Sequence, residues 1–506
     1  MRSTGIIVDA GSAEPLYKQI FDQVVDRVRS RAFPPGYRLP PTRALAGELG
    51  ANRNTVVRAY GDLEAAGFVS STVGRGTFVC AADARKVPRI AAAPRATAKG
   101  WASLLSDAAS GEALRRGDRY ARAPLGRDVV NLTRMQPSPD LLPDELLRRC
   151  MDHVLRKLGP KALAYSPPEG LPELRELIAA DLVASGVPAK AEDVVVTTGS
   201  QQGLDIVARA LVNPGDAVLV DATTYPGAIK LLTLAGARLV PVASDAEGPE
   251  LAALMRLRGT GAKAFYLMPN CRNPTGTCVS AARRRAIVAW SEESGVPLLE
   301  DDYGADIALD DAPPPPALRA LDGDVVHFGT FSKKLVPALR VGFVVCPPAL
   351  RPALVAVKHA MDLGTSALLQ HVLAEFLDRG YLRAHLNRTL PTYRARRDAL
   401  HDSLRAHAPP SVKWALPARG VVMWLELPAG MSAESVFEAA SRKGVLVAPS
   451  AFYEVGLGAP QGIRLTFCAE PEKRLVEGGR RLGEALTALA KEQRRAPGGE
   501  AALEAV

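Results

Sequence analysis

The stretch Gly329–Phe343, GTFSKKLVPALRVGF, places two adjacent lysines, Lys333 and Lys334, after an apolar run, and Arg340 follows a few residues later. An apolar run that ends in polar residues predicts a buried strand leading into a loop. Adjacent residues at the end of an extended strand point to opposite sides, so only one of the two lysines can face a site in that loop. The stretch therefore predicts a strand that delivers one amine and one guanidinium to a ligand.

Four other segments share this plan, in which an apolar strand is followed at once by polar or glycine residues. They are VVVTTGSQQGLD (194–205), AVLVDATTYPGA (217–228), AFYLMPNCRNPTGT (264–277) and VPLLEDDYG (296–304). Strands and helices alternate from residue 128 onward, which predicts an α/β fold with a mostly parallel sheet and flanking helices. Open parallel sheets bind ligands at the carboxyl ends of their strands, so we expect the five strand ends to meet at one crevice.

Two of these strand ends predict a phosphate site with a reactive amine beside it. Residues 198–201 open a helix, whose free backbone amides and hydroxyl group can hold a phosphate. Arg340 is a second candidate phosphate ligand, and Lys333 is a candidate amine for a Schiff base.

The other strand ends predict contacts to an aromatic ring. Tyr225 offers an aromatic face, and Asn273 and Tyr303 offer hydrogen-bond donors. Asp301 ends an apolar strand, where a carboxylate is costly unless a cation or donor meets it. A phosphate, a ring with a protonated nitrogen, a phenolic oxygen and an aldehyde together describe pyridoxal 5'-phosphate, which we expect as the cofactor.

From about residue 130 to 485 the chain resembles the class I aminotransferases of fold type I, which carry a small C-terminal subdomain. The resemblance rests on NPTG (273–276), EDDY (300–303), SKKLVPALRVGF (332–343) and GIRLTF (462–467). It implies that Lys333 forms the Schiff base and that Asp301 pairs with the pyridine nitrogen. Lys334 is then a flanking charge.

The same resemblance implies roles for further residues. Tyr303 and Asn273 would hydrogen-bond the phenolic oxygen, and Tyr225 would stack on the ring. Arg464 would bind a substrate carboxylate as a bidentate fork. Tyr165, in LAYSPPEGLPELR, resembles a tyrosine that reaches the phosphate of the neighbouring subunit, which implies a homodimer. The residues implied to hold the phosphate are Ser200, Gln201, Ser332 and Arg340.

The N-terminal part of the chain carries the excess positive charge. The 506 residues have a net charge of +9, and the whole excess lies in residues 1–127, because residues 128–506 contain equal numbers of basic and acidic side chains. A chain of this length predicts two or more domains. The charge asymmetry indicates a basic module for a polyanion joined to a neutral domain.

Residues 14–80 predict three helices followed by a hairpin. The segments are PLYKQIFDQVVDRVRS (15–30), TRALAGELG (42–50), ANRNTVVRAYGDLEAAG (51–67) and FVSSTVGRGTFVC (68–80). Thr42 can cap the second helix and Gly50 can end it, while Asn52 can cap the third. This order predicts a winged helix-turn-helix, whose third helix presents the side chains of its first turn to DNA bases.

Residues 36–79 resemble the GntR winged-helix family over nearly their whole length. A single surface arginine is more often a solvated charge than a DNA ligand, so the combination carries the prediction. Arg43 and Arg75 are suited to phosphates or the minor groove. The residues expected to approach double-stranded DNA are Arg43, Arg53, Asn54, Thr55, Arg58, Arg75, Gly76 and Thr77.

A GntR-type head on an aminotransferase-type body resembles the MocR/GabR family of bacterial transcriptional regulators. The resemblance implies a DNA-binding regulator that senses an amino compound or the cofactor itself. An active aminotransferase of the 2-aminoadipate or kynurenine type is the alternative, because the catalytic set is complete and YSPPEG and NCRNPTG resemble those enzymes. Met135 stands where both groups usually carry glycine, which should narrow the pocket and argues against efficient turnover. A third hypothesis is a DNA-binding scaffold whose aminotransferase-like domain binds no cofactor. Such a protein would not need both Lys333 and Asp301.

We expect four parts: a winged helix-turn-helix at 1–80, a basic flexible linker at 81–127, an aminotransferase-like domain at 128–490 and a disordered tail at 491–506. A short helix is expected within the linker near residues 101–109. The chain has no apolar run long enough for a membrane span and no secretion signal, so we expect a cytoplasmic protein without a membrane partner. The six cysteines form no CxxC pair, so no metal site is expected.

Overall fold

The computed structural model describes residues 4–9, 11–12, 14–30, 32–72, 76–80, 101–115, 128–456 and 461–495. The chain forms two compact units, residues 1–104 and 105–506, and each is described by itself. Arg75, most of the expected linker and the end of the expected tail lie outside the described residues.

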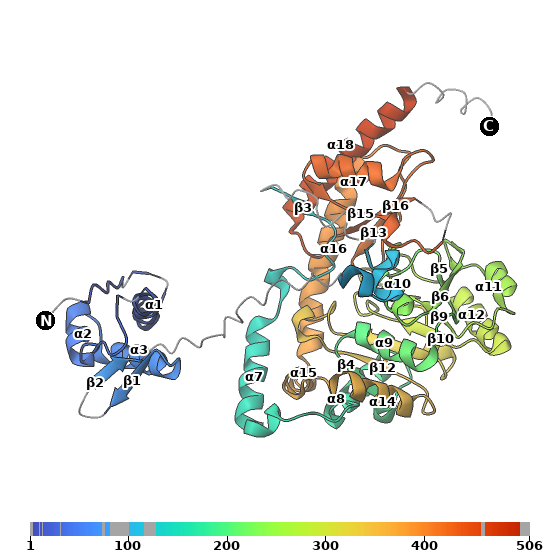
Figure 1. Ribbon diagram of the computed structural model, residues 1–506. Helices are drawn as coiled ribbons and strands as arrows, with labels where there is room; N and C mark the ends of the chain where they lie inside the picture. Colours follow the sequence, from blue (N-terminus) through green and yellow to red (C-terminus); the bar gives the residue numbers. More distant parts are fainter. Residues whose placement is uncertain are drawn as a thin grey trace. The chain divides into compact units, whose positions relative to one another are not determined.

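The first unit is a small helical domain with a hairpin (Figure 1). Its elements are α1 (Leu16–Arg29), α2 (Thr42–Leu49), α3 (Arg53–Ala65), β1 (Val69–Thr72) and β2 (Gly76–Val79). The two strands pair antiparallel, and α3 packs on both α1 and α2. Ile20, Leu45, Val56 and Leu63 are fully buried in the core of this unit. The winged helix-turn-helix predicted from the sequence is confirmed.

The helix ends of this unit follow the sequence signals in part. Asn52 caps α3, because its side-chain oxygen accepts a hydrogen bond of 2.9 Å from the Asn54 amide. Gly50 ends α2 in the left-handed conformation, with φ at 61°. The prediction for Thr42 is wrong: Pro41 is the N-cap residue, and Thr42 is the first residue of the helix. Proline holds its own backbone extended here, so the helix begins directly after it without a side-chain cap.

The second unit is built on a seven-stranded sheet (Figure 1). Its strands, in spatial order, are β4 (Val194–Thr197), β12 (Gly342–Val345), β11 (Val326–Thr330), β10 (Leu298–Asp301), β9 (Ala264–Leu267), β5 (Ala217–Asp221) and β6 (Arg238–Val242). All neighbouring pairs are parallel except the two that β12 makes. The loop 331–341 is too short for a crossover, so the chain returns antiparallel from β11 to β12. The mostly parallel α/β sheet is therefore confirmed.

Helices bury both faces of this sheet. They are α7 (Asp144–Leu158), α8 (Pro172–Ala184), α9 (Ser200–Leu211), α10 (Pro226–Leu234), α11 (Leu251–Leu257), α12 (Ala281–Ser294), α13 (Leu318–Leu321), α14 (Arg351–Asp362) and α15 (Ala367–Asp378). On β4, Val194 and Val196 pack in a cluster with Leu174 of α8, whereas Val195 packs in another with Leu204 of α9. Burial from both sides explains why the strands are apolar throughout instead of alternating.

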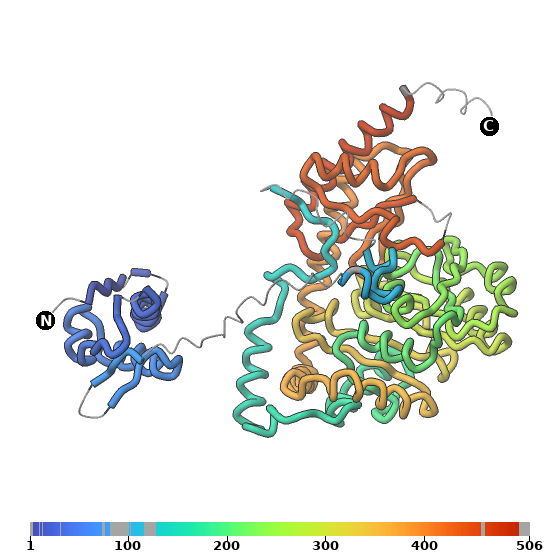
Figure 2. The backbone as a smooth tube through the Cα atoms, in the orientation of Figure 1, coloured from blue at the N-terminus to red at the C-terminus, as the bar shows by residue number. Residues whose placement is uncertain are grey.

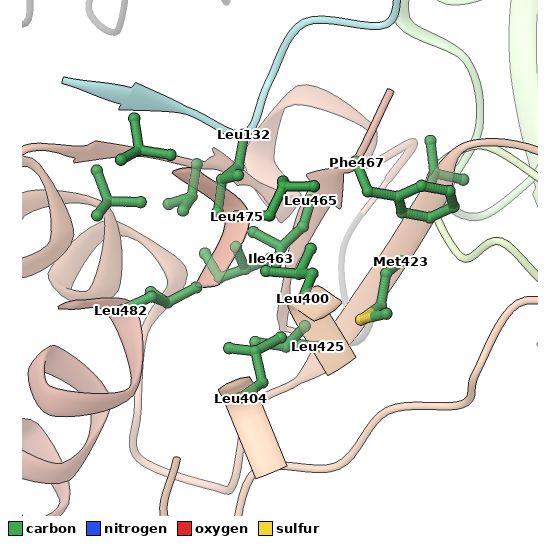
Figure 3. Packing of buried hydrophobic residues seen from close by; sticks show 14 of the residues in the cluster. Leu132, Leu400, Leu404, Met423, Leu425, Ile463, Leu465, Phe467, Leu475 and Leu482 are labelled. Atoms are coloured by element: carbon green, nitrogen blue, oxygen red, sulfur yellow. The ribbon is translucent and has the colours of Figure 1, made fainter. Parts of the chain in front are cut away.

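A smaller subdomain contains the C-terminal part of the chain. Its elements are α16 (Tyr381–His407), β13 (Val422–Glu426), α17 (Ala433–Arg442), β14 (Val445–Leu446), β15 (Ala448–Pro449), β16 (Gly462–Thr466) and α18 (Glu472–Arg495). The segment after residue 128 joins it, because β3 (Val130–Asn131) pairs parallel with β14 (Figure 2). Leu132 lies among Leu465, Leu475 and other apolar side chains of this subdomain (Figure 3). The segment is therefore fixed to the subdomain.

Two boundaries differ from those expected. Helix α18 continues to Arg495, beyond the expected end at 490, because residues 491–495 are helix formers. Within the expected linker, η1 (Trp101–Leu104), α4 (Asp107–Ser110) and α5 (Glu112–Arg115) are helical, and α4 and α5 contact α10. This part of the expected linker is packed, since apolar Ala113 lies against the same core cluster as Tyr225.

The remaining short elements of the second unit are η2 (Pro139–Leu141), η3 (Gly159–Leu163), η4 (Ala191–Asp193), β7 (Ser244–Asp245), β8 (Gly248–Pro249), η5 (Pro337–Leu339) and η6 (Ser450–Phe452). In the parts of the chain that the structure describes, no helix combines the length and the apolar character needed to span a membrane.

Candidate functional site

A cavity lies at the carboxyl ends of five strands, β4, β5, β9, β10 and β11. Its lining residues are Met135, Ser200, Gln201, Tyr225, Met268, Asn273, Asp301, Tyr303, Thr330, Ser332, Lys333 and Arg340. The five strand ends that the sequence predicted to converge therefore line one cavity. Tyr165 and Arg464 are the two predicted residues of this set that do not line it.

One end of the cavity is suited to an anion. Helix α9 begins there at Ser200, and no side chain caps its free backbone amides. Arg340 lies over this end, with Nη1 3.4 Å from the Ser332 hydroxyl. A Cβ atom at Gly199 would lie 2.7 Å from Arg340 Nη2, and Gly199 has φ at 80°, which side chains other than glycine rarely adopt. The helix terminus, two hydroxyls and the guanidinium together form a cradle for a phosphate-sized anion.

Asp301 lies at the end of β10 with one carboxylate oxygen satisfied. Its Oδ2 accepts a hydrogen bond of 2.7 Å from the Tyr266 hydroxyl, whereas its Oδ1 is buried without a partner. Burial raises the pKa of Asp301 to about 6, although the Tyr266 hydrogen bond and the nearby His327 act in the opposite direction. A buried oxygen without a donor is costly, so this position favours a ligand that presents an N–H group.

Lys333 and Arg464 meet at one segment of backbone. Lys333 Nζ donates to the Met135 carbonyl at 2.6 Å, and Arg464 Nη2 donates to the Thr133 carbonyl at 2.6 Å. Burial lowers the pKa of Lys333, and the charges of Arg464 and Arg340 lower it further, with Cys468 opposing them. A lysine in such surroundings is a better nucleophile near neutral pH than a solvated one. Arg464 Nε is buried without a partner.

The neighbouring lysine has a different environment from the one expected. Lys334 was expected to be a flanking charge, but its side chain is only 7% exposed and its Nζ lies 2.7 Å from Asp306 and 3.6 Å from Asp181. The ion pair itself was not predicted, because Asp181 and Asp306 lie far from Lys334 in the sequence and meet it only in the folded chain. Lys334 therefore faces away from the cavity into a buried ion pair.

The three side chains predicted to contact the ring are at the cavity, with different partners. Tyr303 donates its hydroxyl proton to the Cys271 carbonyl at 2.6 Å. Asn273 places Nδ2 3.6 Å from Met135 Sδ, and its Oδ1 is buried without a partner. Tyr225 donates to Gln201 Oε1 at 3.2 Å. Tyr165, by contrast, is 86% exposed.

Two supporting contacts were not found from the sequence. Tyr266, which holds Asp301, lies within a buried strand, and nothing in the motif pattern distinguishes it from a core residue. Behind the anion cradle, the Thr198 amide donates to Gln202, whose side chain donates to Asp362 at 2.7 Å. Lys358, fully buried, holds Asp362 at 2.9 Å. These contacts fix the loop that precedes α9.

The first unit presents most of its predicted DNA-facing residues at its surface. Arg53 and Asn54 are exposed in the first turn of α3, and Thr55 is half-buried beside them. Arg43 is exposed in the first turn of α2. Arg58 is also exposed, but its guanidinium lies 3.7 Å from the centre of the Tyr17 ring.

The hairpin carries the two remaining predicted residues that the structure describes. The Thr77 hydroxyl lies 3.1 Å from that of Ser71 on the paired strand. Gly76 has φ at 114°, and a Cβ atom there would lie 2.9 Å from Arg38 Nε. Arg38, which the sequence prediction missed, also lies over the Phe78 ring and brings another cation to the hairpin.

Residues 127–481 match the family described as Aminotransferase class I and II, and residues 16–79 match the family described as Bacterial regulatory proteins, gntR family. A 2-aminoadipate transaminase of Thermus thermophilus is 33% identical over 75% of this chain and 97% of its own. A probable rhizopine catabolism regulatory protein of Rhizobium meliloti, MocR, is 30% identical over 96% of each chain.

A similar solved structure is that of LysN, an alpha-aminoadipate aminotransferase of Thermus thermophilus in complex with N-(5'-phosphopyridoxyl)-L-leucine. It is 32% identical, covers 78% of this chain and 99% of its own, and has a TM-score of 0.70. The two enzyme matches thus cover about three quarters of this chain, whereas the regulator covers nearly all of it.

Proposed function

The chain belongs to the aminotransferase class I and II family, and because a gntR-type regulatory domain precedes that part, we propose that it is a DNA-binding transcriptional regulator. The observation that carries the proposal is the similarity to a full-length regulator over 96% of both chains, head and body together. The exposed first turn of α3, with Arg53 and Asn54, supports a DNA-reading role for the head.

The cofactor of the body is pyridoxal 5'-phosphate, and its contacts follow from groups that the protein leaves unpaired. The amides of α9, Ser200, Ser332 and Arg340 would hold the phosphate. Asp301 Oδ1, which is buried without a partner, would accept the proton of the ring nitrogen. Asn273 would face the phenolic oxygen and Tyr225 the ring. When bound, the cofactor supplies an aldehyde that reacts with amines and a ring that withdraws electrons.

The effector we propose is an amino compound. Lys333 carries the amine that an incoming amino group would replace, and Arg464 offers a guanidinium for an acid group on the same molecule. Such a ligand alters DNA affinity only as far as it favours one arrangement of the protein over another. Tyr165, at 86% exposure on its own chain, is free to complete the phosphate site of a second copy, which supports a homodimer.

An active aminotransferase is the second candidate. It is favoured by one observation: the lysine, the aspartate and the carboxylate-binding arginine all lie at or beside one cavity. The two functions differ in what happens after an amino compound binds. A regulator changes its DNA affinity, whereas an enzyme releases a keto acid and repeats the cycle with a second substrate.

The test measures both outcomes in the same samples. Purified protein loaded with the cofactor is first used to select fragments from genomic DNA and is then titrated with a panel of amino compounds. We expect selection of a specific fragment, and at least one compound that shifts both the visible absorbance and the DNA affinity. The Arg53→Ala variant should select the fragment more weakly but keep the absorbance shift. Multiple-turnover transamination without selection of any fragment would overturn the regulator proposal.

A further inference from the structure

Met135 lies at the centre of the candidate site on a fixed piece of backbone. The Thr133 amide and hydroxyl both donate to Asn131 Oδ1, at 2.9 Å and 2.7 Å. The Arg134 carbonyl accepts hydrogen bonds from the Thr466 hydroxyl at 3.0 Å and from Cys468 Sγ at 3.4 Å. The backbone that leads into Met135 is thus held by hydrogen bonds.

The Met135 residue contacts three groups that the proposed function needs. Its carbonyl accepts from Lys333 Nζ at 2.6 Å, and its Sδ lies 2.9 Å from Arg464 Nη1 and 3.6 Å from Asn273 Nδ2. Met135 is thus hydrogen-bonded to Lys333 through its carbonyl and to Arg464 through its sulfur. The Met135 side chain therefore lies between the amine and the guanidinium.

This position is where the body of an amino acid ligand must lie. The amino group of such a ligand takes the place of the Lys333 amine, and its carboxylate goes to Arg464. Its α-carbon and side chain then occupy the space between the two, which the Met135 side chain now fills. A ligand with an acid group and a small substituent needs less of that space than one with a large substituent.

The contact with Arg464 is one that a carboxylate can displace. A thioether is a weak hydrogen-bond acceptor, whereas a carboxylate forms two charge-assisted hydrogen bonds with a guanidinium. The methionine side chain has three rotatable bonds and can swing aside while its backbone stays fixed.

We propose that Met135 is the specificity-determining residue of this site and restricts it to compact α-amino acids. The acid group of the ligand displaces the thioether from Arg464, and the rest of the methionine side chain excludes large substituents on the α-carbon. An amine without an acid group leaves the thioether on Arg464 and gains nothing from the guanidinium. This inference rests on the proposed function, since it names the class of ligand that the same site takes.

The test uses the cofactor-loaded, full-length protein and follows its visible absorbance during titration with L-alanine, L-phenylalanine and 2-phenylethylamine. For the parent we expect L-alanine to bind more tightly than L-phenylalanine. The Met135→Ala variant should reduce this preference by about tenfold or more, because exclusion by one side chain in a pocket is worth about 10–200-fold. The Met135→Leu variant keeps a similar volume and should keep the preference. Either variant should still bind L-alanine in preference to 2-phenylethylamine.

Met268 provides the matched control, because it is the other methionine that lines the cavity. Met268→Ala should leave the preference for L-alanine within about threefold of the parent, since it lies outside the contacts of Lys333 and Arg464. A parent that prefers L-phenylalanine, or a Met135→Ala variant with an unchanged preference, would overturn the inference while leaving the proposed function intact. Absence of any absorbance shift with all three compounds and with the wider panel of amino compounds would overturn both.

Discussion

The first turn of α3 and the cavity of the second unit differ in how closely their structure specifies the ligand that each can bind. At the first turn of α3, Arg53 and Asn54 are exposed, and solvent satisfies their polar groups. In the cavity of the second unit, Asp301, Asn273 and Arg464 each have a buried polar atom without a partner. An exposed arginine is compatible with many roles, whereas a buried unpaired atom favours a ligand with the complementary group. The cavity therefore specifies its ligand more closely than the DNA-facing helix does.

The largest effect should come from exchanging the two adjacent lysines, one at a time, for arginine. Lys333→Arg keeps the charge but cannot form a Schiff base, so we expect complete loss of the visible absorbance band of the bound cofactor. Lys334→Arg keeps a cation beside Asp306 and should keep the band. Absorbance spectra of both variants with saturating cofactor decide the matter. Loss of the band in both variants, or in Lys334→Arg alone, would contradict the assignment of Lys333.

A smaller effect, up to about 3 kcal/mol, is expected when Asp301 is replaced by asparagine in the cofactor-free protein. Burial raises the pKa of Asp301 from 3.8 to about 6, so the folded state holds this proton more tightly than the unfolded state. The free energy of unfolding should fall as the pH rises from about 4 to about 6 and remain lower above that range. The asparagine side chain cannot ionise, so the Asp301→Asn variant should be more stable than the parent at pH 8 and similar to it near pH 4.

Urea denaturation at both pH values measures this difference, with Asp311→Asn as the control because the Asp311 side chain is 99% exposed. The same Asp301→Asn variant should bind the cofactor more weakly at pH 8, because asparagine does not keep the ring nitrogen protonated. A variant that is less stable than the parent at pH 8 would contradict the raised pKa of Asp301, and one that binds the cofactor equally well would contradict its pairing with the ring nitrogen.

A substitution in the exposed first turn of α3 should have a smaller effect than the substitutions in the cavity. Arg53→Ala is expected to weaken binding to the selected DNA fragment by about 1–3 kcal/mol, the value of one good base contact. Binding to unrelated DNA should change less, and the cofactor spectrum should stay the same. Fluorescence anisotropy with both DNAs gives the comparison, and Arg29→Ala, an exposed arginine at the end of α1, is the control. Equal losses on both DNAs would place Arg53 on a phosphate instead of a base.

The smallest effect concerns the cap of α3. Asn52→Ala removes the acceptor of the Asn54 amide and should destabilise the helix by about 1 kcal/mol. Hydrogen exchange of α3 amides should become faster by about fivefold, while exchange in α9 and α10 stays unchanged. Faster exchange in both units would indicate that the two units do not unfold independently.

Much of this architecture could be predicted because its signals are local. Each strand that ends in polar residues carries its own pattern, so the strand ends predicted one cavity and most of its lining residues before the fold was known. Contacts between residues far apart in the sequence could not be predicted. The sequence around Lys334 does not indicate its ion pairs with Asp181 and Asp306. Tyr266 lies inside a buried strand, so the sequence does not distinguish it from a core residue or predict its hydrogen bond to Asp301. The packing of α4 and α5 on α10 could not be predicted either, because it also joins residues far apart in the sequence.

Gly199 offers a way to sort related sequences without solving their structures. The local φ of 80° is one that side chains other than glycine rarely adopt, and a Cβ atom there would also crowd the Arg340 guanidinium. A relative that carries another residue at the position of Gly199 is therefore expected to have lost phosphate binding, even when its lysine and aspartate remain. One glycine can thus distinguish chains that still use the cofactor from chains that keep only the fold.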